Sequence, residues 1–247
     1  MSPKQNQIIF GFHSGESGNK NDPVNILQLL VEKNRSDKRM MQLVSYAESQ
    51  GISVEYLKKT DLEKQADSRK TQGVAVRYKA SAQQPSQSLE DILRKDDAFL
   101  LVLDGVTDPH NLGACLRSAD AAGVDAVIVP KDRAAGITPT ARKVACGAAE
   151  SVPFFQVTNL ARTLKQLKDN DVWIAGTAGE AENNIYDVKF SGKLALVMGA
   201  EEKGMRRLTR ENCDQLIKLP MAGQVESLNV SVATGVCLFE IVRQRSL

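Results

Sequence analysis

From residue 98 onward, short apolar runs alternate with segments of helical periodicity. The runs are five to seven residues long and almost continuously apolar, which is typical of buried strands. They are FLLVLD (99–104), AVIVP (126–130), PFFQV (153–157), VWIAGTA (172–178), LALVMG (194–199) and LIKLP (216–220). Helical patterns lie between most of them, at 112–122, 138–147 and 159–169. This alternation predicts an α/β domain with a parallel sheet covered on both faces.

The segment before residue 80 predicts a second, smaller α/β unit. Its expected helices are 24–33, 38–50, which Gly51 would close, and one that begins with the capping-box pattern TDLE at 60–63. Its expected strands are 8–10, 52–57 and QGVAVRY at 72–78.

A polar, proline-containing stretch, SAQQPSQS at 81–88, separates the two parts and has the composition of a linker. We therefore expect an N-terminal domain over 1–79, a linker over 80–97 and a C-terminal domain over 98–247.

The composition favours a reduced, cytoplasmic protein. The chain has 247 residues, of which 42% are apolar, and its net charge is only +2. Its four cysteines form no CxxC pair, its N-terminus has no apolar leader, and no stretch is long enough to span a membrane. Residues 1–95 carry a net +4 and the remainder −2, which permits an RNA partner but fits chance asymmetry equally well.

Several common sites are absent from the sequence. No GxGxxG follows the first strand of the larger domain, and the chain has no GxxxxGK[ST] or GxSxG motif. With only two histidines, a histidine-rich metal site is excluded, and we expect no bound metal.

In parallel sheets, ligands bind beyond the carboxyl ends of the strands. Here these ends carry glycine or small polar residues, where backbone can approach a ligand closely. They are Asp104-Gly105, Gly176-Thr177-Ala178-Gly179, Gly199-Ala200-Glu201 and Pro220-Met221-Ala222-Gly223.

Three stretches near these strand ends carry candidate chemistry. In DPHNLGACLRSADAAG (108–123), we expect Asn111 to cap the following helix; Arg117 is either functional or a surface cation paired with Asp120 or Asp104. VMGAEEKGMRRLTRE (197–211) places Glu201 before a basic tail of Arg206, Arg207 and Arg210, and could equally be an ordinary exposed turn.

The third stretch, PMAGQVESLNVSVATGVCLFE (220–240), is polar in its first half and almost continuously apolar in its second. Ser227 and Asn229 stand just before the apolar helix, where simple capping and a role in a site are compatible.

Together the three stretches resemble the SpoU, or TrmH-type, branch of the SPOUT methyltransferases. The family motifs N-x-x-x-x-x-R, M-G-x-E-x-x-G and P-M-x-G-x-x-x-S-L-N-V occur here in order, within a match over nearly all of residues 99–246. The residues that carry them are Asn111 and Arg117, then Met198, Gly199, Glu201 and Gly204, then Pro220, Met221, Gly223, Ser227, Leu228, Asn229 and Val230. FLLVLDGVTDPHNLGACLRSADAAGV and KVACGAAESVP are similar to the bacterial 23S rRNA guanosine-2′-O-methyltransferase subgroup in particular.

The N-terminal segment resembles, more loosely, the ribosomal-protein L30e-like RNA-binding domain of that subgroup. Two places depart from the family pattern: Ser14–Pro23 interrupts an expected helix, and Glu202 stands where a glycine is common.

The resemblance implies a C-terminal domain with a deep trefoil knot that binds S-adenosylmethionine, in a homodimer whose active site lies at the subunit interface. Residues Thr177, Gly199, Leu219, Met221 and Leu228 would surround the cofactor.

The resemblance also implies roles for the other motif residues. Arg117 would hold the target phosphate or polarise the ribose hydroxyl, oriented by Asn111 and Glu201. Ser227 and Asn229 would position the ribose and the loop.

The implied activity is 2′-O-methylation of a guanosine in 23S rRNA, in the P-loop of the peptidyl transferase centre. Two alternatives stay open: a tRNA ribose methyltransferase, and a ribosome-assembly module without catalysis. The N-terminal domain argues against the first, and the intact motif residues argue against the second.

Overall fold

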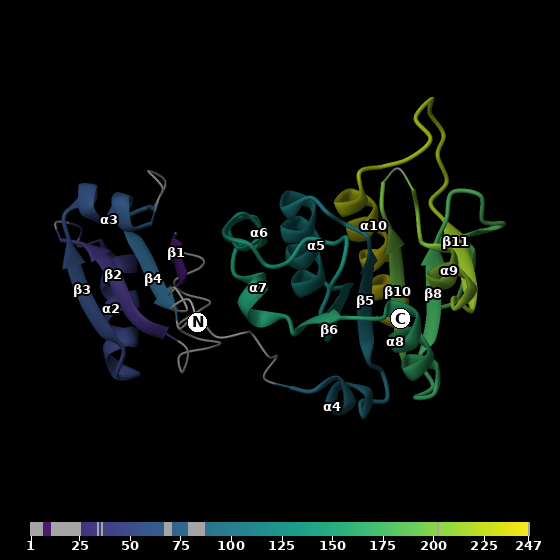
Figure 1. The fold of residues 1–247 in the computed structure, drawn as a ribbon, viewed down its shortest axis with the longest axis horizontal. Coiled ribbons are helices and arrows are strands. Elements are labelled where there is room, and N and C mark those ends of the chain that lie inside the picture. Colours follow the sequence, from purple (N-terminus) through teal and green to yellow (C-terminus); the bar gives the residue numbers. More distant parts are fainter. Residues whose placement is uncertain are drawn as a thin grey trace. The chain divides into compact units, whose positions relative to one another are not determined.

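The computed structural model describes residues 7–10, 26–33, 35, 37–66, 71–78, 87–201 and 203–246. The chain forms two compact units (Figure 1). The first comprises Met1–Gln84 with Arg142–Ser151, and the second Pro85–Ala141 with Val152–Leu247. Ser14–Pro23 and Glu202, the two departures from the family pattern, lie outside the described residues.

The first unit is built on a four-stranded mixed sheet in the order β1-β4-β2-β3. Strand β2 runs parallel to β3 and antiparallel to β4, which also pairs antiparallel with β1. The strands are β1 (Gln7–Phe10), β2 (Ile26–Glu32), β3 (Ser53–Leu57) and β4 (Val74–Tyr78), and the helices α2 (Lys38–Ser49) and α3 (Lys59–Gln65).

Helices α2 and α3 cover opposite faces of this sheet. Leu29 and Val31 of β2 pack with Met40 and Leu43 of α2. Leu30, between them in sequence, packs with Leu62 of α3 on the other side, because successive side chains of a strand point to opposite faces.

The helix expected over 24–33 is wrong, because Ile26–Glu32 forms the central strand β2. Both faces of β2 are covered, so its apolar residues do not alternate with polar ones. A short strand buried on both sides cannot be told from a buried helix by periodicity. Residues 24 and 25 lie outside the described part of the chain.

The helix predicted after residue 60 exists, but its cap does not. Helix α3 begins at Lys59, and Lys58 occupies the N-cap without a side-chain hydrogen bond, so Thr60 already lies within the first turn. The prediction for 38–50 is confirmed: α2 ends at Ser49, and Gly51 follows with a positive φ of 72°.

The second unit contains a seven-stranded parallel sheet in the order β7-β6-β5-β10-β8-β11-β9. The parallel α/β fold is therefore confirmed, and all six expected strands are present. The strands are β5 (Phe99–Asp104), β6 (Ala126–Pro130), β7 (Phe154–Val157), β8 (Trp173–Thr177), β9 (Asn183–Asn184), β10 (Leu194–Gly199) and β11 (Gln215–Lys218).

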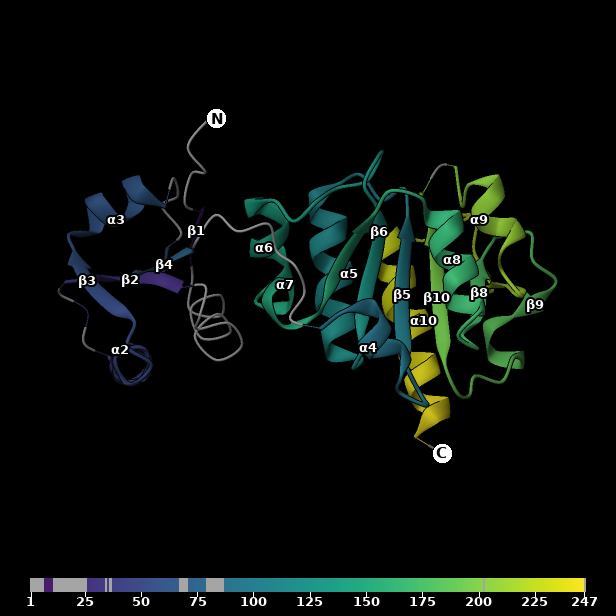
Figure 2. The same cartoon turned by 60° about the horizontal axis from the view of Figure 1, so that its bottom comes forward.

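Helices cover both faces of this sheet. On one face α4 (Leu89–Leu93) and α8 (Leu160–Lys168) pack against Leu100 and Val102 of β5. On the other, α5 (Pro109–Ala121) and α10 (Val230–Arg245) pack against each other and α10 against β10. Figure 2 shows α8 and α10 on opposite sides of the sheet. The second unit also contains the 3₁₀ helix η2 (Ile185–Asp187) and α9 (Arg207–Glu211). Helix α6 (Pro139–Ala145) spans the boundary between the two units at Arg142, and α7 (Ala148–Ser151) is assigned to the first unit.

The end of the segment expected to be a linker contributes to the core. Ser88 caps α4 with a complete capping box, and Leu89, Ile92 and Leu93 of that helix are buried in the second unit. Residues 79–86 lie outside the described part, and the proposed domain limits of 1–79, 80–97 and 98–247 remain a prediction.

None of the described helices is long and apolar enough to cross a membrane.

The four cysteines are free thiols. Burial raises the pKa of Cys115 to about 11 and that of Cys237 to about 12. These thiols therefore stay protonated and unreactive at neutral pH.

The last helix is fastened near its carboxyl end by Gln244. The backbone N–H of Phe190 donates to Oε1 of Gln244 at 3.0 Å, and Nε2 of Gln244 donates to the carbonyl of Val188 at 3.0 Å and to Oε1 of Glu240 at 2.8 Å. Arg243 donates through Nε and Nη2 to the same carboxylate. The hydrogen bonds from Arg243, followed by that from Gln244, lower the pKa of Glu240 to about 2.

We predict that Glu240→Gln flattens the acid dependence of stability. The folded-state pKa of Glu240, about 2, lies below the ordinary value of 4.5 for a glutamate side chain. Its contribution to the free energy of unfolding is therefore present above pH 4.5 and is lost as the pH falls toward 2. Urea unfolding between pH 7 and 3 measures the difference between wild type and variant. Glu211→Gln, which removes an exposed ion pair with Arg207 on α9, is the matched control and should change little. Parallel pH curves for wild type and Glu240→Gln would contradict this prediction.

Candidate functional site

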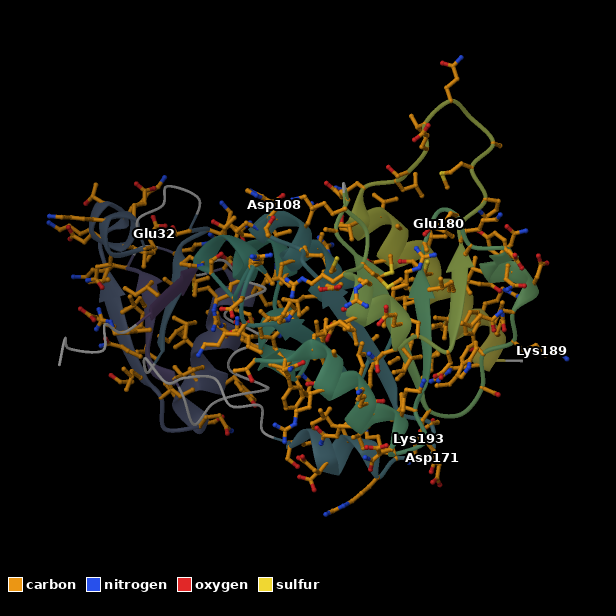
Figure 3. The ribbon with its side chains drawn as sticks, turned by 45° about the vertical axis from the view of Figure 1, so that its right-hand side comes forward. Glu32, Asp108, Asp171, Glu180, Lys189 and Lys193 are labelled. Atoms are coloured by element: carbon orange, nitrogen blue, oxygen red, sulfur yellow. The ribbon has the colours of Figure 1, made fainter. Side chains whose placement is uncertain are left out.

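The candidate site lies at the carboxyl ends of the central strands. The chain runs outward from β5 through β6 to β7, then returns to place β10 and β8 on the other side of β5. In Figure 3, Asp108 after β5 and Glu180 after β8 lie at one edge of the sheet, whereas Asp171 and Lys193, which precede strands, lie at the opposite edge. The reversal of strand order between β5 and β10 makes this edge the expected position of a ligand crevice.

A first cavity of about 510 Å³ opens beyond β8, β10 and β11. Every residue expected to bind the cofactor lines it, and the expected catalytic residues Glu201 and Ser227 do so as well. The five cofactor candidates are Thr177, Gly199, Leu219, Met221 and Leu228. Thr177 and Gly199 are the last residues of β8 and β10, and the other three come from the long connection between β11 and α10 that projects from the sheet in Figure 1.

Gly199 lets two backbone segments meet at the wall of this cavity. A Cβ atom on Gly199 would lie 2.3 Å from the carbonyl carbon of Gly204 and 2.4 Å from the nitrogen of Met205. The loop between them closes on itself through hydrogen bonds of 3.1 Å and 2.8 Å between Ala200 and Gly204. A side chain at position 199 is therefore incompatible with this loop.

Three motif residues that are distant in sequence converge on one carboxylate oxygen. Oε1 of Glu201 accepts from Nδ2 of Asn229 at 2.6 Å, from the backbone N–H of Val230 at 3.0 Å and from Nδ2 of Asn111 at 3.4 Å. Asn229 Nδ2 also donates to Oδ1 of Asn111 at 2.9 Å. We call Asn111, Glu201 and Asn229 the amide–carboxylate cluster.

Asn229 serves the cluster and caps α10 at the same time. Its Oδ1 accepts from the backbone N–H groups of Ser231 and Val232, at 3.0 Å and 3.4 Å, while its Nδ2 faces Glu201 and Asn111. The expected cap by Asn111 is wrong, because Asp108 occupies the N-cap of α5 and accepts from His110. Pro109, a residue favoured at the first helical position, starts the helix earlier and leaves Asn111 free to join the cluster.

Arg117 lies apart from the cluster in this chain. Six residues along α5 correspond to about 600° of rotation, so Arg117 points roughly 120° away from Asn111 around the helix. Arg117 is exposed, and the hydrogen bonds of the cluster join Asn111 and Glu201 to Asn229. The structure thus brings three of the five catalytic candidates together and places Ser227 on the wall of the neighbouring cavity.

A second cavity of about 490 Å³ lies at the switch point between β5 and β10. It shares Ala200, Glu201, Lys203, Gly204 and Val230 with the first cavity, so the 200–204 loop and the start of α10 form a common wall. The rest of its lining is Asp104, Gly105, Val106, Thr107, Asp108, Asn111, Arg133 and Arg206.

The floor of the second cavity contains a buried carboxylate that sequence reasoning did not single out. The side chain of Asp104 is fully buried at the end of β5, where its Oδ2 accepts from the backbone N–H of Arg206 at 2.8 Å. Its Oδ1 lies 3.4 Å from Nε of Arg206. The position of Asp104 at a strand end was the available signal for a role in the site. Its partner, Arg206, lies 102 residues later in the chain and could not be inferred from sequence spacing.

The described residues contain no group of three or more histidine, cysteine, aspartate or glutamate side chains that could hold a metal ion. The polar side chains that line the two cavities include the amide of Asn111, several carboxylates and several cations, which can bind and position a substrate through hydrogen bonds and charge.

Two family models match the chain. The SpoU rRNA Methylase family matches residues 98–239, and a domain described as RNA 2′-O ribose methyltransferase substrate binding matches residues 8–84.

Curated relatives and a solved structure agree with these matches. The chain is 55% identical to 23S rRNA (guanosine-2′-O-)-methyltransferase RlmB of Escherichia coli (strain K12), over 97% of this chain and 99% of that protein. It is 58% identical to the protein of the same name from Haemophilus influenzae, over 96% and 97% of the two chains. The crystal structure of the SpoU methyltransferase AviRb from Streptomyces viridochromogenes, in complex with AdoMet, superposes with a TM-score of 0.82 at 23% identity and covers 98% of this chain and 91% of AviRb.

We predict that Gly199→Ala lowers the affinity for S-adenosylmethionine by at least about tenfold. The added methyl group must displace the backbone of Gly204 and Met205, and such overpacking costs roughly 1–3 kcal/mol. Gly179→Ala is the control, because Gly179 lines the same cavity but a Cβ there meets nothing within 4 Å. Titration calorimetry of both variants gives the comparison. Equal affinities would mean that the 199–204 loop does not shape the cofactor cavity.

Proposed function

The chain belongs to the SpoU rRNA methylase family, and we propose that it methylates the 2′-hydroxyl of a guanosine in 23S rRNA with S-adenosylmethionine as donor. The observation that carries this proposal is the convergence of all three family motifs at two adjoining cavities. The relatives that match nearly the whole chain bear the name of this reaction. We place the modified guanosine in the P-loop of the peptidyl transferase centre and the protein in the bacterial cytoplasm.

The first cavity fits the methyl donor. Its volume of about 510 Å³ lies within the usual range for small-molecule sites. Because Gly199 has no side chain, its backbone leaves room for the cofactor to approach closely, and Leu219, Met221 and Leu228 supply apolar surface. S-adenosylmethionine, when bound, supplies a methyl group on a sulfonium that leaves a neutral thioether. We further propose that the loops around this cavity form the deep trefoil knot of the family.

The amide–carboxylate cluster is suited to hold the acceptor ribose beside this cavity. Glu201 fixes the start of α10 and the 200–204 loop, and Asn111 and Asn229 are locked in a single orientation by their mutual hydrogen bond of 2.9 Å. Preorganised donors and acceptors of this kind align a hydroxyl for in-line attack. We assign Ser227 and Asn229 to positioning the ribose and Arg117 to the phosphate or the 2′-oxygen.

The exposed face of α10 supports a homodimer. Val232, Val236 and Phe239 recur at helical spacing and are 52%, 36% and 50% exposed. Such an exposed apolar stripe, on a helix whose buried side chains include Cys237, Leu238 and Ile241, fits the surface of a second copy. Because α5 packs beside α10, this dimer would bring Arg117 close to the subunit interface.

The first unit supports an RNA substrate. Its matched model describes substrate binding by RNA 2′-O-ribose methyltransferases. We propose that residues 1–79 bind the rRNA while residues 98–247 transfer the methyl group.

The proposal is tested by methyl transfer to 23S rRNA from cells that lack this protein, with mapping of 2′-O-methyl sites. The wild-type chain should modify one guanosine. Arg117→Ala should reduce the rate by at least about one to two decades, since a charged hydrogen bond contributes roughly 1.5–3 kcal/mol. Arg117→Lys should restore little, because a point charge does not reproduce the guanidinium fork. Cofactor affinity, measured on the same variants, should stay unchanged. A near-normal rate for Arg117→Ala would leave Arg117 as a surface cation.

We predict that Phe239→Asp dissociates the dimer while each chain stays folded. Half of the Phe239 side chain is exposed in a single chain, so a carboxylate there remains hydrated in the monomer but would be desolvated in the dimer. Sedimentation should show a wild-type dimer and a mutant monomer with unchanged circular dichroism. Ser246→Asp, at the exposed C-cap of the same helix, is the control for adding a charge to α10. A wild-type monomer at micromolar concentration would exclude the dimer.

A further inference from the structure

The second cavity has a cationic lining that the motif residues do not explain. Arg133, Lys203 and Arg206 border it, and each comes from a loop at the carboxyl edge of the sheet. Among the residues that the structure describes, the side chains of Arg133 and Lys203 have no hydrogen-bonded or ionic partner. Two cations beside one cavity, both without a partner of opposite charge, attract an anion.

The acidic residues of the same lining are already engaged. Asp104 accepts from Arg206, Asp108 caps α5 through the His110 amide, and Glu201 accepts three hydrogen bonds within the amide–carboxylate cluster. These hydrogen bonds leave the three negative charges in place, but they occupy carboxylate oxygens with protein donors. The N–H donors of Arg133 and Lys203, by contrast, are unused within the described residues and remain available to a ligand.

Arg206 is held in place while part of its guanidinium stays accessible. Its backbone N–H donates to Oδ2 of buried Asp104 at 2.8 Å, its Nε lies 3.4 Å from Oδ1 of the same carboxylate in an ion pair, and its Nη2 donates to the carbonyl of Asp132 at 3.1 Å. The side chain remains 42% exposed. A guanidinium has five N–H donors in a rigid fork, so donors remain for an anion, and the fork is suited to two oxygens of a phosphate.

The position of the cavity indicates which anion it receives. It shares Glu201, Lys203 and the start of α10 with the first cavity, so a ligand in the second cavity lies beside the methyl donor and next to Asn111. Under the proposed function, the groups flanking the acceptor ribose are the phosphodiesters of the RNA chain.

We propose that the second cavity binds a backbone phosphate of the substrate RNA next to the methylated ribose. Arg206 is its principal ligand, Arg133 and Lys203 add charge, and Asp104 is a positioning residue that orients Arg206. This inference rests on the proposed function, because it assumes that RNA is the substrate.

The test compares Arg206→Ala with its sequence neighbour Arg207→Ala. Arg207 carries the same charge and is also exposed, but it pairs with Glu211 on α9 and lines neither cavity. Filter binding of a 23S rRNA fragment at several salt concentrations gives the affinity and its salt slope. Arg206→Ala should weaken RNA binding about ten- to a hundredfold and reduce the slope by about 1, as expected for one lost phosphate contact. Arg207→Ala should stay within about threefold of the wild type.

A second pair of variants separates phosphate binding from a structural role. Arg206→Ala alone leaves the Asp104 carboxylate buried without its cation and is expected to lower the thermal unfolding midpoint. The double variant Asp104→Asn with Arg206→Ala removes that charge and should recover the midpoint while RNA binding stays weak. Asp104→Asn alone keeps Arg206 but removes the ion pair that orients its side chain. This variant should therefore raise the KM for RNA, but by less than Arg206→Ala does.

Three results would overturn the inference: normal RNA affinity and salt slope for Arg206→Ala, recovery of RNA binding in the double variant, or a loss of S-adenosylmethionine affinity equal to the loss of RNA affinity. The last result would assign the anion to the carboxylate of the cofactor. The proposed function is judged separately on the wild type, because its failure appears as absent methylation of 23S rRNA, whereas failure of this inference leaves wild-type methylation intact.

Discussion

Oε1 of Glu201 joins three segments of the chain that no local interaction brings together. Its donors are Nδ2 of Asn111, Nδ2 of Asn229 and the amide of Val230, which lie 90, 28 and 29 residues away in sequence. The bond to Val230 satisfies one of the unpaired amides at the start of α10, and Asn229 satisfies two more. The carboxylate therefore fixes where the last helix begins, and with it the wall that both cavities share. Because α10 also carries the exposed apolar stripe, the geometry of the site and the proposed dimer surface depend on the same helix.

The parallel sheet explains why so few side chains suffice to build the site. All seven strands point in one direction, so the residues after β5, β8, β10 and β11 meet at one edge without further arrangement. The reversal of strand order between β5 and β10 opens the second cavity, and the glycine at the end of β10 allows the 200–204 loop to fold back tightly enough to divide it from the first. The ligand sites are thus a consequence of topology, and the side chains refine them.

The features that were predictable from sequence are those with a strong local signal. The apolar runs of the second unit are continuous and separated by segments of helical periodicity, and β5, β6 and β10 have the expected limits. Prediction failed where a local pattern is compatible with two structures. The apolar pattern of Ile26–Glu32, a strand buried on both faces, is equally compatible with a helix. Asp108 and Asn111 are both good capping residues, so the sequence did not decide which of them begins α5. The ion pair of Asp104 with Arg206 is set by tertiary proximity, which spacing does not encode. The motifs identified the family, but the contacts among their residues required the fold.

The separation of Arg117 from the amide–carboxylate cluster has a simple account if the site is completed by a second chain. Within one chain, Arg117 lies about 120° around α5 from Asn111, so the two side chains leave the helix in different directions. Yet α5 and α10 lie side by side, and α10 leaves Val232, Val236 and Phe239 exposed. Pairing α10 with its copy would bury this stripe and bring each subunit's α5 toward the neighbouring site. The cations of the second cavity then serve one phosphate from within the subunit, while Arg117 serves another group across the interface. On this view a monomer retains the cofactor cavity and the cluster but lacks the cation that acts on the acceptor ribose.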